Sequence, residues 1–247
     1  MRLQVQLRSI TGYEDAFAAL LMSKRSWTNE KDDAIREAVY CCTEANGSLI
    51  YDSLPDRRLE KSREVFDKWM EKVVKWKDHI TLLKFINFSF TVIGLHRGGQ
   101  DDWDAHAERF NNRIIRNSTR LSKFAEGEMS DFYKGKIIPA TEACELLGIE
   151  LPYKFEREGV TFVKTINGYI REDLKEDKDT LRGLYMMSIP STFIFDINAA
   201  EWAHVYKMRN KSTGAHPEVK QVAEMIADLL EEANPYFTRE FWMSIPN

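Results

Sequence analysis

The chain has 247 residues, with 35 lysines and arginines against 39 aspartates and glutamates, so its formal net charge is −4. Hydrophobic residues make up 43% of it and charged residues 30%, which excludes a disordered or collagen-like chain and predicts a globular protein. The three cysteines contain no Cys-x-x-Cys pair, which excludes a disulfide framework or a cysteine-built zinc site. This cysteine usage predicts a cytoplasmic protein. We expect no signal peptide, because the first residues contain no basic segment followed by an apolar run. We expect no membrane partner, because no apolar run is long enough to span a bilayer.

Hydrophobic periodicity and capping residues predict the elements of the first half of the chain. Alternating apolar and polar residues predict a strand from about residue 3. Helices are expected after it at 13–23, 28–46 and 56–77. The next expected elements are a buried strand at 85–95, a loop at 97–100 and a polar helix at 102–117.

In the second half, Asn167-Gly168 between two β-prone runs is the strongest hairpin signal. Strands are expected around it at 160–166 and 169–171, and again at 185–197. Helices are expected at 139–147, 198–209 and 217–233. Together these elements predict an α+β fold. We expect a single domain over residues 1–247, with a mostly antiparallel sheet flanked by long helices.

A row of arginines is the clearest candidate for a binding site. Four of them are spaced by four, three and four residues, which would place them on one face of a helix. They are Arg109, Arg113, Arg116 and Arg120. Guanidinium groups suit phosphate, and Asn117 and Ser118 add neutral hydrogen-bonding groups. We therefore expect a phosphate-bearing small ligand, while a solvated face paired with acidic residues is the alternative.

Other chemistry is mostly excluded. None of the five histidines has metal-ligand spacing to another histidine or a glutamate, so no metal site is expected. No nucleophile elbow, P-loop or dinucleotide glycine motif occurs. An acidic chain without a recognised binding module predicts no nucleic-acid partner. Arg209 ends an expected helix, where the helix dipole alone favours a basic residue.

Taken together, these pieces resemble the flavin-dependent thymidylate synthase (ThyX) family from about His79 to the C-terminus. The family's histidine, its Phe-x-Phe strand and its Ser-x-Arg motif are matched by His79, Phe88-Ser89-Phe90 and Ser118-Thr119-Arg120. Its later motifs are matched by Arg182, Asn198, Met208-Arg209 and Ala215-His216-Pro217-Glu218. The spacing from the first to the third of these later motifs fits the family without a gap.

This resemblance implies a flavin-dependent methyltransferase acting on carbon five of a pyrimidine nucleotide, most simply converting dUMP to dTMP. Methylene-tetrahydrofolate would donate the carbon, FAD would be the flavin, and NADPH would reduce it. The family consists of homotetramers with active sites at subunit interfaces, so a homotetramer is expected. No enzyme nucleophile is expected, because flavin and folate carry the chemistry while the protein supplies position and charge.

The resemblance also implies roles for individual residues. Arg182 and Arg209 would be catalytic, because an arginine at the uracil carbonyl would stabilise negative charge developing on the ring. The residues implied to hold the nucleotide are Arg116, Ser118, Arg120, Arg182 and Arg209. The residues implied to contact flavin or folate are His79, Arg97, Gln100, Arg109 and Asn198.

The chain departs from the family pattern at some of these positions. Glu108-Arg109-Phe110 stands where the family has Arg-His-Arg, and Ala200 stands where the family has an arginine. Two alternatives therefore stay open. One is an enzyme of the same fold that modifies UMP or a cytosine nucleotide, and the other is a non-catalytic nucleotide-binding protein of that fold.

Overall fold

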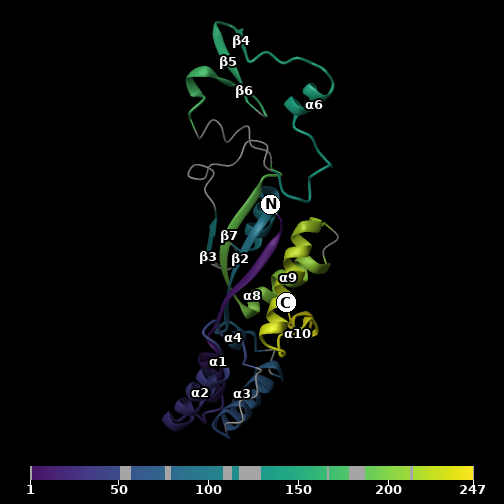
Figure 1. The fold of residues 1–247 in the computed structure, drawn as a ribbon. Coiled ribbons are helices and arrows are strands. Elements are labelled where there is room, and N and C mark those ends of the chain that lie inside the picture. Colours follow the sequence, from purple (N-terminus) through teal and green to yellow (C-terminus); the bar gives the residue numbers. More distant parts are fainter. Residues whose placement is uncertain are drawn as a thin grey trace. The chain divides into compact units, whose positions relative to one another are not determined.

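The computed structural model of the chain describes residues 2–50, 57–75, 79–107, 113–116, 129–165, 167–177, 187–211 and 214–246. Helices and strands are mixed along the chain, and the α+β prediction with antiparallel sheets is confirmed (Figure 1). Contacts divide the chain into two compact units. The first unit takes Met1–Gln4, Val92–Asp102 and Ile115–Phe193. The second takes Val5–Thr91, Trp103–Ile114 and Ile194–Asn247. The single domain over residues 1–247 stays a prediction.

Four strands form one sheet in the order β1-β2-β7-β3. Their bounds are β1 (Gln4–Thr11), β2 (Asn87–His96), β7 (Pro190–Asn198) and β3 (Arg113–Arg116). The strands predicted from residue 3, at 85–95 and at 185–197 are therefore confirmed with shifted ends. Pro190 begins β7, and the first residue of a strand is a position where a missing N–H is tolerated.

The second unit is mainly helical. Its helices are α1 (Tyr13–Ser23), α2 (Asn29–Cys42), α3 (Arg57–Lys75), α4 (Ile80–Leu83), α8 (Ala199–Lys211), α9 (Pro217–Ala233) and α10 (Arg239–Ser244). The first three pack against one another, and α8 packs against α9 and α10 (Figure 1). The predicted helices at 13–23 and 217–233 are confirmed at both ends. The helix predicted at 28–46 is confirmed at its start, because the Thr28 side chain caps the Lys31 N–H at 3.3 Å, but it ends at Cys42.

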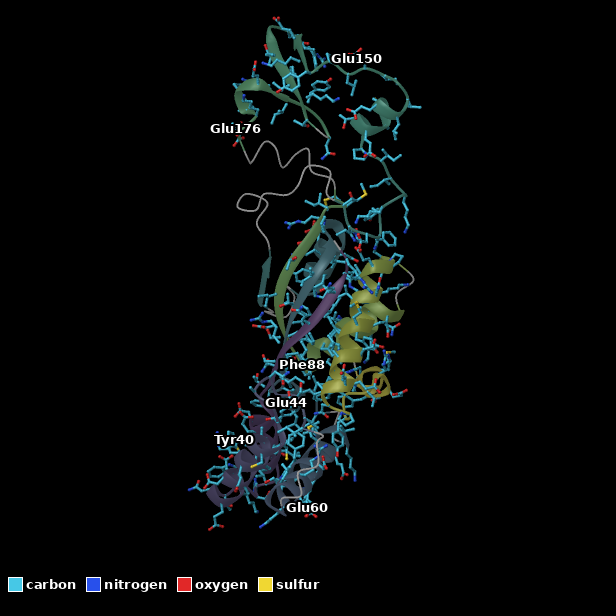
Figure 2. All side chains as sticks on the ribbon, viewed as in Figure 1. Tyr40, Glu44, Glu60, Phe88, Glu150 and Glu176 are labelled. Carbon is cyan, nitrogen blue, oxygen red and sulfur yellow. The ribbon has the colours of Figure 1, made fainter. Side chains whose placement is uncertain are left out.

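Buried aromatic rings form the core of the second unit. The Phe88 ring, on β2 (Figure 2), meets Phe237 edge-on at 5.4 Å and Trp242 edge-on at 6.0 Å between centroids. Tyr13 packs edge-on against Phe66 at 5.3 Å and accepts a hydrogen bond on its hydroxyl from the Asn234 amide at 3.1 Å. Edge-to-face contacts add to the area that the rings bury. The core therefore joins the N-terminal helices to the C-terminal ones.

Ion pairs of Arg239 hold α10 against α9. The guanidinium donates to the carboxylates of Asp228, Glu224 and Glu231, with distances of 3.1 Å to Glu224 and 2.9 Å to Glu231. Hydrogen bonds and charge from Asp228 and then Glu224 raise the pKa of Arg239. All three partners lie on α9, so one side chain holds the last helix in place.

The first unit contains a second, three-stranded sheet. The strands of this sheet are β4 (Lys154–Arg157), β5 (Val160–Thr165) and β6 (Gly168–Arg171). The same part of the chain contains the helix α6 (Ala140–Leu146) and the 3₁₀ helix η2 (Glu172–Leu174). The predicted hairpin at Asn167-Gly168 is confirmed, because β5 and β6 pair antiparallel with Thr165 opposite Gly168. Strand β4 was not predicted. It pairs with β5 so that the rings of Phe155 and Phe162 stack 5.3 Å apart.

Two predictions between residues 97 and 117 are wrong. Residues 97–100 are not a loop, because helix α5 (Arg97–Ala107) begins directly after β2. The polar helix does not continue to residue 117, because β3 (Arg113–Arg116) is a strand. Residues three apart share one face of a helix but alternate to opposite faces in a strand, and Arg113 and Arg116 are three apart. The four arginines therefore do not form a helical row.

Gly12 and Gly148 both have left-handed backbone, but only Gly12 is crowded by a neighbouring atom, so replacing each by alanine tests strain and crowding separately. Gly12 has φ +86°, and a Cβ there would lie 2.0 Å from the Phe85 carbonyl oxygen. We predict that Gly12→Ala lowers the free energy of unfolding by more than about 2 kcal/mol, because strain and a backbone clash add. Gly148 has φ +70° with no described atom within 4 Å, so Gly148→Ala should cost only about 1 kcal/mol. Urea unfolding measures both, and equal losses would contradict this account.

Candidate functional site

The structure describes the side chains of some predicted site residues but not of others. Described are those of His79, Arg97, Gln100, Asn198 and Arg209. Outside the described side chains lie those of Arg109, Arg116, Ser118, Arg120 and Arg182. The roles of these five residues stay predictions. Arg97 and Gln100 belong to the first unit, and the other three described residues belong to the second.

The junction between β2 and α5 positions Arg97 and Gln100. The first two N–H groups of α5 donate to backbone carbonyls of the segment that precedes β7. Arg97 N–H donates to the Ile189 carbonyl at 2.9 Å, and Gly98 N–H donates to the Met187 carbonyl at 3.1 Å. A Cβ on Gly99 would lie 2.6 Å from the His96 ring, so the absence of a side chain there lets the buried ring lie against the helix. The sequence predicted a loop, whereas Arg97 and Gln100 lie in the first turn of a helix.

Gln100 is fully buried, at 0% exposure. Its Oε1 accepts from the Ser191 hydroxyl and, at 3.5 Å, from Arg97 Nη1. Its Nε2 has no hydrogen-bond partner among the described residues. A buried donor without an acceptor costs about 1–3 kcal/mol. The site therefore holds a donor that an oxygen atom of a bound molecule would satisfy.

Asn198 closes β7 and caps α8. Its Oδ1 accepts from the Glu201 N–H at 3.0 Å, which is the N-cap hydrogen bond of a helix that begins at the next residue. Its side-chain amide nitrogen makes no hydrogen bond within the described part of the chain. The helix predicted to open here is confirmed. The capping bond fixes the carboxamide and leaves its N–H groups to donate elsewhere.

Arg209 lies in the last turns of α8 and is 5% exposed. A guanidinium keeps its charge when buried, so a site of low dielectric strengthens its attraction for a nearby anion. Eleven residues separate it from Asn198, which is close to three helical turns. The two positions therefore share one side of α8 and lie roughly 16 Å apart along it.

His79 lies directly before α4, with an exposed side chain. It borders a cavity of about 480 Å³ whose other lining is largely apolar. The lining residues are Ala19, Met22, Ser23, Lys24, His79, Thr81, Leu82 and Phe85. This cavity, between α1 and α4, could hold part of a flat aromatic molecule.

A second cavity of the second unit was not predicted from the sequence. It has a volume of about 360 Å³ and is lined by Ser9, Thr11, Asn87, Phe88, Ser89 and Asp196. Polar residues two apart on β1 and β2 were the available signal, because such residues share one face of a strand. Asp196 is likewise two residues before Asn198 on β7. The polar lining therefore lies on the same face of β7 as Asn198.

Cys42 is not an activated thiol, and the described residues contain no metal cluster. Cys42 is 1% exposed, and burial raises the pKa of its thiol to about 11. No group of three or more histidine, cysteine, aspartate or glutamate side chains among the described residues could hold a metal ion. Within the same residues, no helix has both the length and the apolar character needed to cross a membrane.

Comparison with known proteins identifies the family. The family model described as thymidylate synthase complementing protein (Thy1) matches residues 25–236. The chain therefore belongs to this family, and the predicted resemblance is confirmed. A search of curated proteins gave no match.

Solved structures support the same fold. Two structures of the flavin-dependent thymidylate synthase ThyX from Helicobacter pylori, both with FAD and dUMP, align with 14% sequence identity and a TM-score of 0.56. The alignments cover 98% and 97% of this chain and 99% of the matched chains. At this identity the likeness shows the fold, which is the ThyX-like fold predicted from the sequence.

The capping role of Asn198 can be separated from a ligand-binding role. We predict that Asn198→Ala lowers the free energy of unfolding by about 1 kcal/mol, because α8 loses its N-cap. Asn198→Asp keeps the capping oxygen and should stay within about 0.5 kcal/mol of wild type while losing the amide donors. Urea unfolding gives both values. An aspartate variant as unstable as the alanine variant would rule out the capping account.

Burial of Cys42 gives a prediction for thiol chemistry. A thiol with a pKa of about 11 has roughly a thousandth of its population as thiolate at pH 8. We expect iodoacetamide to modify Cys42 at least tenfold more slowly than the half-buried Cys41 at pH 8, and expect unfolding in urea to remove the difference. Mass spectrometry of tryptic peptides reports both rates. Rapid alkylation of Cys42 in the folded protein would instead indicate an activated nucleophile.

Proposed function

We propose that the protein is a flavin-dependent thymidylate synthase-like enzyme that methylates carbon five of a pyrimidine nucleotide, most simply dUMP. Membership of the thymidylate synthase complementing protein family over residues 25–236 is the observation that carries this proposal. The shared fold with ThyX structures that contain FAD and dUMP supports it.

The described donors fit a flavin. The buried Nε2 of Gln100 and the amide of Asn198 offer N–H groups, and a flavin ring presents carbonyl and nitrogen acceptors. We propose that Arg97, Gln100 and Asn198, together with His79 and Arg109, hold FAD or the folate. A bound flavin would supply reducing equivalents for the one-carbon transfer.

The arginines are proposed to act on the nucleotide. Arg209 is buried, so its charge would stabilise negative charge on the pyrimidine ring more strongly than an exposed cation could. We assign the same catalytic role to Arg182. The further residues proposed to hold the nucleotide, its phosphate included, are Arg116, Ser118 and Arg120.

The proposed reaction needs two further small molecules and an assembly. Methylene-tetrahydrofolate would donate the carbon and NADPH the reducing equivalents. We propose a homotetramer with active sites at subunit interfaces, and a cytoplasmic location from the cysteine usage. These features come from the family resemblance and from composition.

The nucleotide-binding assignment predicts a specific loss of affinity. Arg120→Ala and Arg182→Ala should each weaken dUMP binding at least tenfold, because each removes a charged hydrogen-bonding group. Arg157→Ala is the matched control, since that arginine is exposed on β4 and its side chain is 74% accessible. Calorimetric titration measures all three. Unchanged dUMP affinity in both test variants would remove those residues from the site.

Product analysis tests the activity itself. The full chain is supplied with FAD, NADPH, methylene-tetrahydrofolate carrying a labelled methylene carbon, and dUMP. We expect dTMP that carries the label in its methyl group. Labelled product from UMP or a cytosine nucleotide, with none from dUMP, would favour the enzyme of changed specificity, and no product from any pyrimidine nucleotide would contradict the proposed activity.

A further inference from the structure

The carboxamide of Gln100 is held in one orientation. Its oxygen accepts from the Ser191 hydroxyl and from Arg97 Nη1. Turning the amide over would place its N–H groups against the Arg97 guanidinium, which has no acceptor to offer. The nitrogen therefore occupies the other side of the carboxamide, where it meets no acceptor among the described residues.

Backbone hydrogen bonding beside Ser191 fixes the position from which its hydroxyl donates to Gln100. Ser191 lies at the start of β7 and is 2% exposed. Two residues earlier, the Ile189 carbonyl accepts from Arg97 N–H at 2.9 Å, so the same stretch of chain binds both the backbone of α5 and the Gln100 side chain. Any shift of Ser191 would therefore be opposed by the backbone bond.

Two more hydroxyls at this helix start have no partner among the described residues. They belong to Ser130 and Ser188, which are 0% and 4% exposed. The two residues are joined by a bond from Ser130 N–H to the Ser188 carbonyl at 2.8 Å. Ser188 also lies between Met187 and Ile189, whose carbonyls accept from the first two N–H groups of α5.

Three buried polar groups on residues next to the start of α5 lack a partner among the described residues, which indicates that a bound partner is missing. Buried polar side chains nearly always have a hydrogen-bond partner, which is protein, water or ligand. The partial positive charge at the start of a helix such as α5 favours an electron-rich atom there. Gln100 Nε2 can only donate, and the two serine hydroxyls can donate as well. An oxygen acceptor is therefore the chemistry that this place fits.

We propose that Ser191 is a positioning residue that holds Gln100 so that Nε2 donates to an oxygen of a bound ligand, and that the hydroxyls of Ser130 and Ser188 complete this subsite. The proposal rests on the proposed function and deepens it. The oxygen belongs to a ring carbonyl of the flavin, to a carbonyl of the pyrimidine, or to a phosphate. The hydroxyl of Ser191 donates to Gln100 and acts on the ligand only through that side chain.

Calorimetric titration of the full chain with FAD, dUMP and inorganic phosphate, each alone, tests the subsite. Ser191→Ala should weaken binding of the ligand that supplies the oxygen roughly tenfold and leave the other two unchanged. Ser191→Thr keeps the hydroxyl and should restore affinity. Gln100→Glu replaces the donor by an acceptor and should weaken the same ligand further. Ser62→Ala, a buried serine on α3 of the second unit, is the matched control.

The three probes separate the possible outcomes. A loss confined to one probe supports the proposal and identifies the source of the oxygen. If the wild-type chain binds FAD and dUMP, and neither Ser191→Ala nor Gln100→Glu alters that binding, the subsite is overturned. Water would then be the partner of Gln100, and the proposed function would stand. A wild-type chain that binds none of the three probes overturns both.

A second measurement does not depend on a variant that folds. The side-chain amide of Gln100 gives its own pair of signals in a nitrogen–proton correlation spectrum of the labelled wild-type protein. FAD, dUMP and inorganic phosphate are added separately, and the one that supplies the oxygen should shift these signals downfield, because the amide protons gain an acceptor. Signals that stay in place at saturating concentrations of all three probes would overturn the proposal.

Discussion

Two backbone hydrogen bonds between the start of α5 and the approach to β7 determine the candidate site in the first unit. A helix that begins directly after a strand leaves its first N–H groups without partners inside the helix. Here the carbonyls of Ile189 and Met187 accept from Arg97 and Gly98. This pairing brings Gln100 to Ser191, which lies 91 residues away in the chain. These backbone bonds hold the two segments together, and the Gln100 amide nitrogen is buried where they meet.

The described side chains could position ligands and supply charge rather than act as nucleophiles. Cys42 is buried with a raised thiol pKa, which keeps it protonated and unreactive near neutral pH. Gln100 and Asn198 instead offer amide donors from fixed carboxamides, and Arg209 offers a buried cation. Such groups suit a reaction in which cofactors carry the bond-making steps. These residues would therefore suit the enzyme that we propose from family membership.

Local sequence patterns predicted those elements whose ends and apolar faces are set by their own residues. The helix at 217–233 has Pro217 at its start and a regular apolar face, and it was predicted at both ends. The region 97–117 was predicted wrongly, because Gly98-Gly99 favours a loop by local propensity and the bonds that favour a helix come from distant residues. For the site, the sequence indicated Gln100 and Asn198 through the family resemblance. It could not show the contact of Ser191 with Gln100, because that contact joins distant segments. For the polar cavity around Asp196 it offered only the polar residues two apart on β1 and β2, because which strands line the cavity depends on contacts across the sheet.

Flavin binding is the property on which the proposed activity depends most directly. The visible absorption spectrum of the purified full chain, recorded alone, after FAD and then after dUMP, measures it. We expect a flavin band that differs from that of free FAD and shifts again when the nucleotide is added. A band identical to free FAD at every protein concentration, unmoved by dUMP, would contradict a flavin-dependent thymidylate synthase.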